Sequence, residues 1–376
     1  MTMSTGGSIV RPSIAVDFHV AAGKRQGTRT FLEGIYPSNG SLDQEFAVHR
    51  ILDRGQSDAG LINVHRFPSR GRMGRYLLGA RRLERALRPD GWHFQYLLPL
   101  GLSRPAALTI HDVLPLTHPH LFTSGQRAYF RALMMRSIQR AKVITTGSHF
   151  SANAIATHAS IDERTIHVTG YGVQPDLFQP HPLASDSETL RSMGIPEQYF
   201  LCVGRIERRK NHAAAFAAFA RLVGSNRTAL VVVGSPEKTG PDLGKLAQSH
   251  GVLGRTRHLA NVAPRGLAVL YRNAVALIAP SLAEGFDLPV IEALASGCPV
   301  IASAIPPHEE VLAGHGLLFN PSSVEDLRRH LQEVLDERPK ELVRRGLRRA
   351  QDFSWQAAQT RIAKAFRELL EAPLRP

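Results

Sequence analysis

The segment EGFDLPVIEALASGCPVIAS, residues 284–303, places two carboxylates around a glycine and a proline. Pro289 suits the first turn of a helix, where its missing N–H costs nothing, and Gly297 suits the end of that helix. Glu284 is therefore expected in the loop before the helix, and Glu292 within about its first turn. Free N–H groups at a helix start bind phosphate, and carboxylates accept hydrogen bonds from hydroxyl groups. The segment predicts a site for a phosphate flanked by a diol. The alternative is a capped helix with an acidic first turn, which the helix dipole favours.

A second group of charges lies in the sequence LCVGRIERRKN, residues 201–211. A strand is expected to end at Gly204, and a helix is expected to start near Asn211. The loop between them carries the cations Arg205, Arg208, Arg209 and Lys210. Arginine can grip two phosphate oxygens and lysine adds a point charge, so this loop suits a phosphate. The spacing does not choose among the four cations, and a solvated basic loop is the alternative.

His111 stands at the end of another expected strand, at the edge of a parallel sheet where ligands bind. It could donate a hydrogen bond to a sugar hydroxyl or act as a base, and a structural role is the alternative. Gly23 and Gly27 lie between the first strand and a helix, which suits close approach of a phosphate or sugar. The sequence contains no dinucleotide-binding or P-loop glycine motif and no cluster with metal-ligand spacing, so no metal is expected.

Short apolar runs alternate with helical segments along the chain, which predicts an α/β protein with two doubly wound parallel sheets. The expected domains are residues 1–180 and 198–354, joined by a linker at 181–197, and a helix at 355–376 that can pack back on the first domain. The strands expected in the first half are 14–18, 61–64, 92–97, 107–111, 143–146 and 166–169. Those expected in the second half are 200–204, 229–234, 258–262, 275–280 and 299–303.

The chain of 376 residues has a formal net charge of +14, with 46 basic residues that are mostly arginine. It has only two cysteines, Cys202 and Cys298, both in apolar surroundings, which favours a reducing compartment. It contains no apolar run of about 18 residues that could span a membrane. Residues 1–18 do not have the pattern of a signal peptide. A cytoplasmic protein is therefore expected.

Arginines are dense between residues 66 and 88, where leucines recur at helical spacing. This pattern predicts a basic amphipathic helix that docks on an anionic acceptor or a membrane surface. The residues expected on that surface are Arg75, Arg81, Arg82, Arg85 and Arg88. The alternative is a solvated helix that packs through its leucines.

Taken together, the motifs resemble those of a known enzyme family. The sequence VGRIERRKN is followed about 75 residues further on by APSLAEGFDLPVIEALASGCPVIAS. This pair resembles the retaining glycosyltransferases of family 4. The segments QGTRTFLEGI, TIHDVLPLTHP, VITTGSHFSANAI, IHVTGYGVQPDLF, GLLFNPSSVEDL and FSWQAAQTRI fit the same family in the expected order. The resemblance spans nearly the whole chain and implies the GT-B fold, in which two Rossmann-like domains face each other across a cleft.

The resemblance also implies roles for single residues. Arg205 and Lys210 would hold the donor's diphosphate, Glu284 the hydroxyls of the transferred sugar, and Glu292 the nucleotide ribose. His111 would contact the donor sugar near the reacting carbon. The catalytic set is thus His111, Arg205, Lys210 and Glu284, and the donor-binding set adds Gly27, Gly285, Phe286, Asp287, Leu288 and Glu292.

Two positions depart from the family pattern. Asp287 replaces a usual glycine, which adds a third carboxylate near a dianionic ligand. The sequence YGVQPDLF, which starts at Tyr171, replaces a usual asparagine-glycine-valine-aspartate run.

The resemblance implies transfer of a sugar, with retention and without a bound metal or other cofactor, from a nucleotide-diphosphate sugar to an acceptor hydroxyl. The acceptor would be a glycan or a polyprenyl- or lipid-linked molecule, and the donor weakly favoured is GDP-mannose, with UDP-sugars close behind. We expect a cytoplasmic enzyme, peripheral at the inner face of the membrane. One alternative is a nucleotide-sugar epimerase or hydrolase of the same fold. A nucleic-acid-binding protein is a more distant alternative, because the arginines are not interleaved with aromatic residues, and no nucleic-acid partner is expected.

Overall fold

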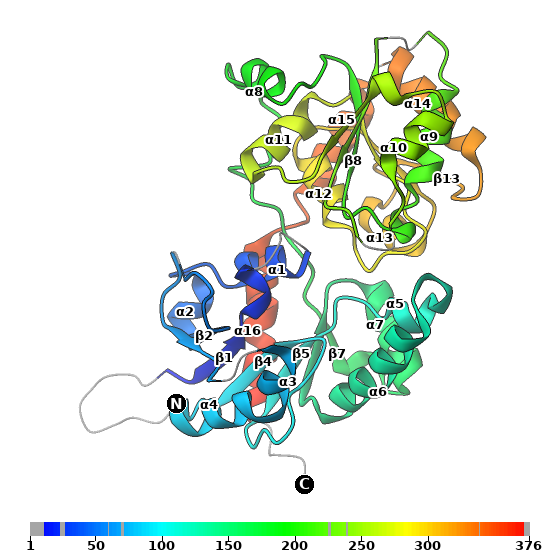
Figure 1. Cartoon of the computed structure of the whole chain (residues 1–376). Helices are drawn as coiled ribbons and strands as arrows, with labels where there is room; N and C mark the ends of the chain where they lie inside the picture. Colours follow the sequence, from blue (N-terminus) through cyan, green and yellow to red (C-terminus); the bar gives the residue numbers. More distant parts are fainter. Residues whose placement is uncertain are drawn as a thin grey trace. The chain divides into compact units, whose positions relative to one another are not determined.

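The computed structural model describes residues 11–22, 27–58, 60–68, 71–224, 227–237, 240–337 and 339–371. The chain divides into two compact units (Figure 1). Unit 1 comprises Met1–Gly172 and Ser354–Pro376, and unit 2 comprises Val173–Phe353. Unit 2 therefore starts a few residues before the boundary expected at residue 180. The expected linker 181–197 contains a helix, α8 (Asp186–Ser192), which belongs to unit 2.

Unit 1 is built on a seven-stranded parallel sheet with the order β3-β2-β1-β4-β5-β6-β7. Its strands are β1 (Ser13–Asp17), β2 (Ala47–Leu52), β3 (Val64–Arg66), β4 (Gly91–Gln95), β5 (Ala106–Thr109), β6 (Val143–Thr146) and β7 (Ile166–Val168). The order reverses between β1 and β4, and such a reversal opens a crevice at the carboxyl ends of the strands.

Two strands of unit 1 differ from the expectation. Strand β2 was not expected, because its AVHRIL pattern carries an arginine in the middle of a strand. Arg50 is nevertheless fully buried, because its guanidinium forms two hydrogen bonds with Asp43 and further ones with backbone carbonyls. The strand expected at 61–64 was also wrong, because β3 begins only at Val64.

The helices of unit 1 cover both faces of its sheet. Helices α1, α2 and α16 pack against one another on one face, and α4, α6 and α7 lie on the other (Figure 1). The α-helices are α1 (Gly27–Ile35), α2 (Ser41–Glu45), α3 (Gly71–Gly74), α4 (Ala80–Leu87), α5 (Leu114–Thr117), α6 (Ser124–Arg140), α7 (His149–Ala159) and α16 (Trp355–Glu371). Single 3-10 turns lie at His19–Ala22, Pro119–Leu121 and Glu163–Thr165.

Helix α16 completes unit 1 although it comes from the end of the chain. It contacts α1, α2 and the strands β5, β6 and β7. Phe366 packs edge-on against Phe46, with ring centroids 5.7 Å apart, and lies 5.5 Å from the ring of His93. Trp355 sits where a side chain on Gly34 would clash with it, so the glycine permits this close approach.

Unit 2 repeats the same architecture with six parallel strands in the order β10-β9-β8-β11-β12-β13. The strands are β8 (Tyr199–Val203), β9 (Ala229–Val233), β10 (Thr256–Leu259), β11 (Ala276–Ala279), β12 (Val300–Ser303) and β13 (Leu317–Phe319). Here the order reverses between β8 and β11. The first five strands lie within a few residues of the expected ranges, and β13, which is only three residues long, was not expected.

The helices of unit 2 form two groups on the two faces of its sheet (Figure 1). One group contains α9 (His212–Ala220), α10 (Leu243–Ser249) and α14 (Val324–Glu337), and the other contains α8, α11 (Pro264–Asn273), α12 (Leu288–Ala295) and α15 (Lys340–Ala350). Helix α13 (Pro306–Leu312) follows β12, and 3-10 turns lie at Arg208–Lys210 and Leu253–Arg255. In the part of the chain that the structure describes, no helix has both the length and the apolar character needed to cross a bilayer.

Candidate active site

The loops after β8 and β11 bring oppositely charged side chains together in unit 2. Because these two strands flank the reversal of strand order, their loops meet at the place where such sheets bind ligands. We call Arg209, Lys210, Glu284, Asp287 and His308 the charged cluster. The first two follow β8, the next two follow β11, and His308 comes from α13.

Lys210 is the central cation of the charged cluster. Its Nζ lies 2.8 Å from Oε1 of Glu284 and 2.7 Å from Oδ1 of Asp287. Arg209 holds Glu284 from the other side, through its Nη1 and the carboxylate Oε2. Arg209 also donates to the carbonyl of Ala283 at 2.7 Å. Glu284 thus touches two cations, and Asp287 touches one.

The second partner of Asp287 is His308, which is fully buried. Its Nε2 lies 3.1 Å from Oδ2 of Asp287, and its Nδ1 lies 2.9 Å from the carbonyl oxygen of Ser303. A carbonyl can only accept, so Nδ1 carries a hydrogen. Nε2 faces the carboxylate, so both ring nitrogens of His308 are directed at acceptor oxygens.

The pairing keeps these groups charged in spite of their burial. Burial alone would raise the pKa of Asp287, but Lys210 and His308 outweigh it and hold that pKa below its usual range. Burial would likewise raise the pKa of Glu284, and Arg209 and Lys210 lower it. Burial disfavours the charged form of Lys210, but Asp287 and Glu284 together raise its pKa. A ligand that enters here meets ionised partners.

Local backbone features place the charged cluster. Gly204 has φ of +142°, and a side chain there would lie 2.8 Å from Cε of Lys210, so a glycine lets the lysine cross the end of β8. Asp287 stands just before α12 with φ of +74°, a left-handed conformation that is uncommon for a residue with a side chain. As predicted, Pro289 lies in the first turn of α12 and Gly297 follows its end with φ of +70°.

Glu292 is the fifth residue of α12, just past its first turn and close to where it was expected. It is buried, and the hydroxyl of Tyr271 on α11 donates to its Oε2 at 3.0 Å. Residues Gly285 to Leu288 form the short loop that leads into α12. The Phe286 ring is buried against Phe353, with centroids 5.8 Å apart, so this loop is packed in place.

The four cations after β8 do not lie alike. Arg205 is exposed, and its guanidinium is 3.5 Å from carboxylates of Glu207 and Glu237. Arg208 is also exposed. Arg209 and Lys210 point into the charged cluster instead. The structure therefore brings Lys210 and Glu284 together as expected, and it adds Arg209 and His308, which the sequence analysis had not chosen.

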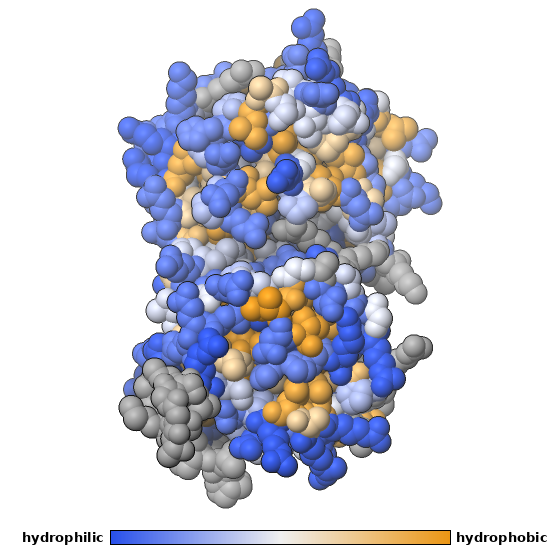
Figure 2. Space-filling view, turned by 90° about the vertical axis from the view of Figure 1, so that its left-hand side faces the viewer, coloured by the Kyte–Doolittle hydropathy of each residue, from blue (hydrophilic) through white to orange (hydrophobic). Residues whose placement is uncertain are grey.

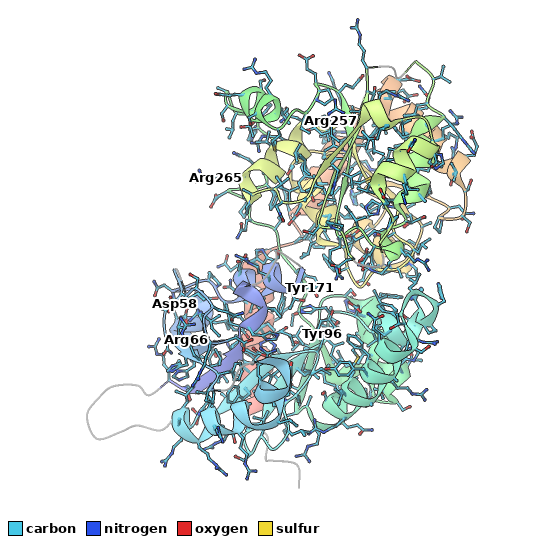
Figure 3. The ribbon with its side chains drawn as sticks, viewed as in Figure 1. Asp58, Arg66, Tyr96, Tyr171, Arg257 and Arg265 are labelled. Atoms are coloured by element: carbon cyan, nitrogen blue, oxygen red, sulfur yellow. The ribbon has the colours of Figure 1, made fainter. Side chains whose placement is uncertain are left out.

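In unit 1, His111 lies among aromatic rings at the carboxyl end of β5. Its ring centroid is 5.0 Å from that of Phe31, 5.3 Å from Tyr96 and 6.0 Å from Tyr171. Nδ1 of His111 forms a 2.6 Å hydrogen bond with the hydroxyl of Tyr171, and its Nε2 has no hydrogen-bond partner among the described residues. Figure 3 labels the two tyrosines, which lie toward the same edge of unit 1.

Burial makes His111 a neutral imidazole. It lowers the pKa of His111 to about 3, far below the usual value for histidine. The neighbouring His93 also has a pKa of about 3, through burial and the nearby His111. His93 hydrogen-bonds Tyr36 and, at 2.6 Å, Thr109. A neutral imidazole carries one N–H and one bare nitrogen, so His111 can donate a hydrogen bond but cannot supply a positive charge.

Two other expected features of unit 1 are seen in part. Gly27 is the first residue of α1 and is exposed, while Gly23 and the rest of the loop before it lie outside the described residues. Tyr171 stands where the family usually has asparagine, and its ring fills the space beside Gly147, where a side chain would clash with it.

The arginine-rich segment forms one continuous helical run, as expected, made of α3, a π-helical stretch at Arg75–Gly79 and α4. Arg75 is not on the surface as expected but buried, with Nη1 2.5 Å from Oδ2 of Asp53 and the guanidinium against the ring of Phe67. An arginine needs such a counter-charge to be buried. The remaining arginines of the predicted surface are exposed: Arg81, Arg82, Arg85 and Arg88.

Glu84, the acidic residue within this arginine-rich helix, faces the interior. Its carboxylate accepts hydrogen bonds from the Trp92 indole at 3.0 Å and from the backbone N–H of Ser103 at 2.9 Å. Leu83 is buried beside it in the core. The exposed face of α4 therefore carries cations without Glu84 to balance them.

The whole arrangement matches a known structural class. The chain is similar in structure to sucrose-phosphate synthase from Thermosynechococcus elongatus, with a TM-score of 0.81 and 20% sequence identity over 96% of this chain and 100% of that chain. Two units, each with a parallel sheet of Rossmann-like order, define the GT-B fold.

The sequence comparisons narrow this class to one family. Residues 189–351 match the family described as Glycosyl transferases group 1, and residues 39–177 match Glycosyltransferase Family 4. O-antigen chain mannosyltransferase B of Escherichia coli is 30% identical over 279 residues, 73% of each chain. O-antigen chain mannosyltransferase RfbU of Salmonella typhimurium is 31% identical over 223 residues, 59% of this chain and 58% of that one. The chain belongs to glycosyltransferase family 4, a family of retaining hexosyltransferases.

Proposed function

We propose that this enzyme transfers mannose from GDP-mannose to a hydroxyl group of a glycan or lipid-linked acceptor, in the synthesis of a cell-surface polysaccharide or glycolipid. Two curated relatives that share about 30% of its sequence are named as O-antigen mannosyltransferases, which supports mannose as the transferred sugar. The observation that carries the proposal is the charged cluster, in which Lys210 lies at the start of α12 between two buried carboxylates. This arrangement suits a diphosphate attached to a sugar.

The main chemical task is to stabilise the departing nucleoside diphosphate. Negative charge grows on the diphosphate as the bond to the anomeric carbon breaks, and preorganised cations and N–H groups stabilise it. We assign this role to Lys210 and to the start of α12 at Leu288. Arg205, which is exposed and only loosely paired at 3.5 Å, can reach out to the same group. Glu292, in the second turn of α12, would hold the ribose.

Glu284 would hold hydroxyls of the transferred sugar rather than attack it. Its carboxylate is fixed by Arg209 and Lys210, so it is available as a hydrogen-bond acceptor while its charge stays neutralised. The family retains the anomeric configuration. We therefore place the attack of the acceptor on the face that the phosphate leaves, with a phosphate oxygen taking the acceptor's proton.

His111 would donate a hydrogen bond to the donor sugar near the reacting carbon. The hydroxyl of Tyr171 keeps its hydrogen, because burial and the nearby Asp112 raise its pKa. When Tyr171 donates this hydrogen to Nδ1, the ring hydrogen of His111 is on Nε2. That nitrogen has no hydrogen-bond partner among the described residues, so it is available to a sugar hydroxyl.

The acceptor side is proposed to meet an anionic surface, such as the inner face of a membrane with a lipid-linked acceptor, through α4. The exposed Arg81, Arg82, Arg85 and Arg88 supply the charge. Leu77 and Leu100 are 45% and 41% exposed and can supply apolar contacts. Leu100 lies close to Leu77, because its N–H donates to the carbonyl of Tyr76, the residue before Leu77. Cations beside exposed leucines suit the interface of an anionic membrane. Figure 2 shows apolar patches among hydrophilic residues on one face of unit 1.

The test is a donor panel with and without acceptors. The protein is incubated with GDP-mannose, GDP-fucose, UDP-glucose and UDP-galactose, and released nucleoside diphosphate is measured. We expect release to be fastest with GDP-mannose and to depend on a lipid-linked or glycan acceptor, with an α-linked product by NMR. Release that never depends on an acceptor would favour a hydrolase or epimerase of the same fold. Faster transfer from a UDP-sugar would contradict the proposed donor.

A further inference from the structure

The proposed function assigns Lys210 to the diphosphate, but the carboxylate of Asp287 already forms an ion pair with this lysine. Its Oδ1 lies 2.7 Å from Nζ of Lys210, and the Asp287 side chain is buried. An ammonium group has three hydrogens, and in this structure two carboxylates face that of Lys210. A diphosphate that binds Lys210 must therefore take the place of a carboxylate or share the ammonium group with it.

Neither the backbone conformation nor helix capping explains an aspartate at position 287. Its φ of +74° lies in the region that glycine adopts without strain. Its side chain does not form the usual helix-capping hydrogen bond with α12. A buried charge at a strained position points to a task for the carboxylate itself.

His308 is a second partner for the carboxylate of Asp287. Nε2 of His308 touches Oδ2 of Asp287 at 3.1 Å, and its Nδ1 is anchored on the carbonyl of Ser303. If Lys210 turns toward a ligand, Asp287 keeps its contact with His308 and is not left without a partner. The contact with His308 thus lowers the free-energy cost of moving Lys210 from Asp287 to a ligand.

We propose that Asp287 is a positioning residue that competes with the diphosphate for Lys210, and that this competition speeds release of the nucleoside diphosphate product. The inference rests on the proposed function, because it needs a diphosphate at Lys210. In the empty site Asp287 holds Lys210 in place. After transfer it recaptures the lysine as the product leaves. His308 sets the strength of the competition, because it shares the carboxylate.

The test compares the variants Asp287→Asn and His308→Gln with the wild type. Asparagine keeps the size of the side chain, tolerates a positive φ and removes the charge. We expect Asp287→Asn to bind GDP about tenfold more tightly, within the range of couplings of about 5- to 150-fold between groups that act on one equilibrium. Its GDP dissociation rate should fall by a similar factor. His308→Gln leaves Lys210 as the main cation on Asp287, so GDP should bind more weakly.

The opposite signs distinguish competition from a structural role, which would weaken binding in both variants. The matched control is Glu309→Gln, which removes one negative charge from an exposed position next to His308. Thermal unfolding shows that each variant is folded. Calorimetry and stopped-flow measurements use GDP, UDP, GMP and inorganic pyrophosphate as probes. The gain in binding affinity of Asp287→Asn should appear with GDP and pyrophosphate. It should be smaller with GMP, which lacks the diphosphate.

Each result separates this inference from the proposed function. If Asp287→Asn binds diphosphates no more tightly than the wild type, while the wild type binds GDP, the competition is wrong and the donor site stands. If GDP binds to the Asp287→Asn variant but not to the wild type, the Asp287 carboxylate competes strongly enough to prevent binding, which supports the inference. If no diphosphate binds either protein, both the inference and the proposed site are overturned.

Discussion

In unit 2, the loops beyond β8 and β11 carry buried groups that remain ionised, such as Lys210 and Asp287. In unit 1, the loop beyond β5 carries His111, which burial makes neutral. Both sites lie at the carboxyl ends of parallel strands whose order reverses in the same way. The difference lies in the partners, because Lys210, Glu284 and Asp287 each touch an opposite charge, whereas His111 touches a phenol and aromatic rings.

This contrast shows how similar burial leads to opposite protonation states. Desolvation disfavours every buried charge, and only a close opposite charge reverses the effect. Unit 2 is thereby built to meet a charged group, and unit 1 is built to donate or accept hydrogen bonds without charge.

Removing the central cation should have the largest effect. In Lys210→Ala, turnover with GDP-mannose should fall by about 10²- to 10³-fold, the effect of losing one group that stabilises the leaving charge. Glu284 and Asp287 would each lose a cation, so the free energy of unfolding should fall by up to about 3–5 kcal/mol. Steady-state kinetics and urea unfolding measure the two effects.

The control for Lys210 is Arg208→Ala, which removes an exposed cation two residues away. It should change turnover and stability little, because exposed ion pairs contribute at most about 1 kcal/mol. Normal turnover in Lys210→Ala would remove the phosphate role of this lysine, and with it the functional contrast between the units.

Acid should weaken unit 1 before unit 2. His93 and His111 have pKa values of about 3 in the folded state, below the usual value near 6.5, so the unfolded chain binds more protons between these pH values. Their contribution is fully present above about pH 6.5 and is lost as the pH falls, by about 1.4 kcal/mol per pH unit for each histidine. In unit 2, His212 has a pKa of about 4, and Asp287 has a lowered pKa that keeps it charged at lower pH.

The two tryptophans make this prediction measurable, because Trp92 and Trp355 both belong to unit 1. Urea unfolding followed by tryptophan emission should show unit 1 weakening between about pH 7 and about pH 5.5, while hydrogen exchange in unit 2 changes less. His93→Gln should reduce the slope with pH, although burial also lowers the pKa of His49 and His65 in unit 1, and His120→Gln, an exposed control, should leave it unchanged. Equal loss in both units would contradict the contrast.

The parts of the molecule that the sequence predicts are those coded by neighbouring residues. The loop and helix from Glu284 to Gly297 follow from proline, glycine and apolar spacing within one segment. Strand β6 coincides with the expected 143–146, because four apolar and β-branched residues form one run. The sequence predicts doubly wound parallel sheets but not the order of their strands. The pairing of β2 with β3 or of β12 with β13 depends on segments that are separated along the chain.

The parts that the sequence does not predict depend on a partner far along the chain. Arg75 has the pattern of a surface residue, but Asp53 draws it inside. His308 lies 21 residues from Asp287 in sequence and meets it only because α12 and α13 pack together. No pattern in the sequence marks either pair.

The hydrogen bond from Tyr171 should tune His111 without any change of charge. In Tyr171→Phe, Nδ1 of His111 loses its 2.6 Å partner, and its ring hydrogen is no longer directed to Nε2. We expect a loss of about 1 kcal/mol in stability and about a tenfold fall in kcat, with a smaller change in the KM for the donor. Tyr96→Phe is the matched control, since its hydroxyl donates to Asp112 at 2.9 Å. Equal effects from both variants would argue against a specific role of Tyr171.

The smallest expected effect concerns the outer surface of α4. An arginine near an anionic membrane contributes about 1 kcal/mol, so Arg82→Gln should lower binding to phosphatidylserine vesicles about fivefold at low salt. Arg265→Gln on unit 2 removes the same charge from another exposed position (Figure 3) and should have little effect, as should Arg257→Gln. Vesicle sedimentation measures the binding. Equal losses from the two units would mean that the net charge of +14 attracts the membrane and that α4 is not a specific docking surface.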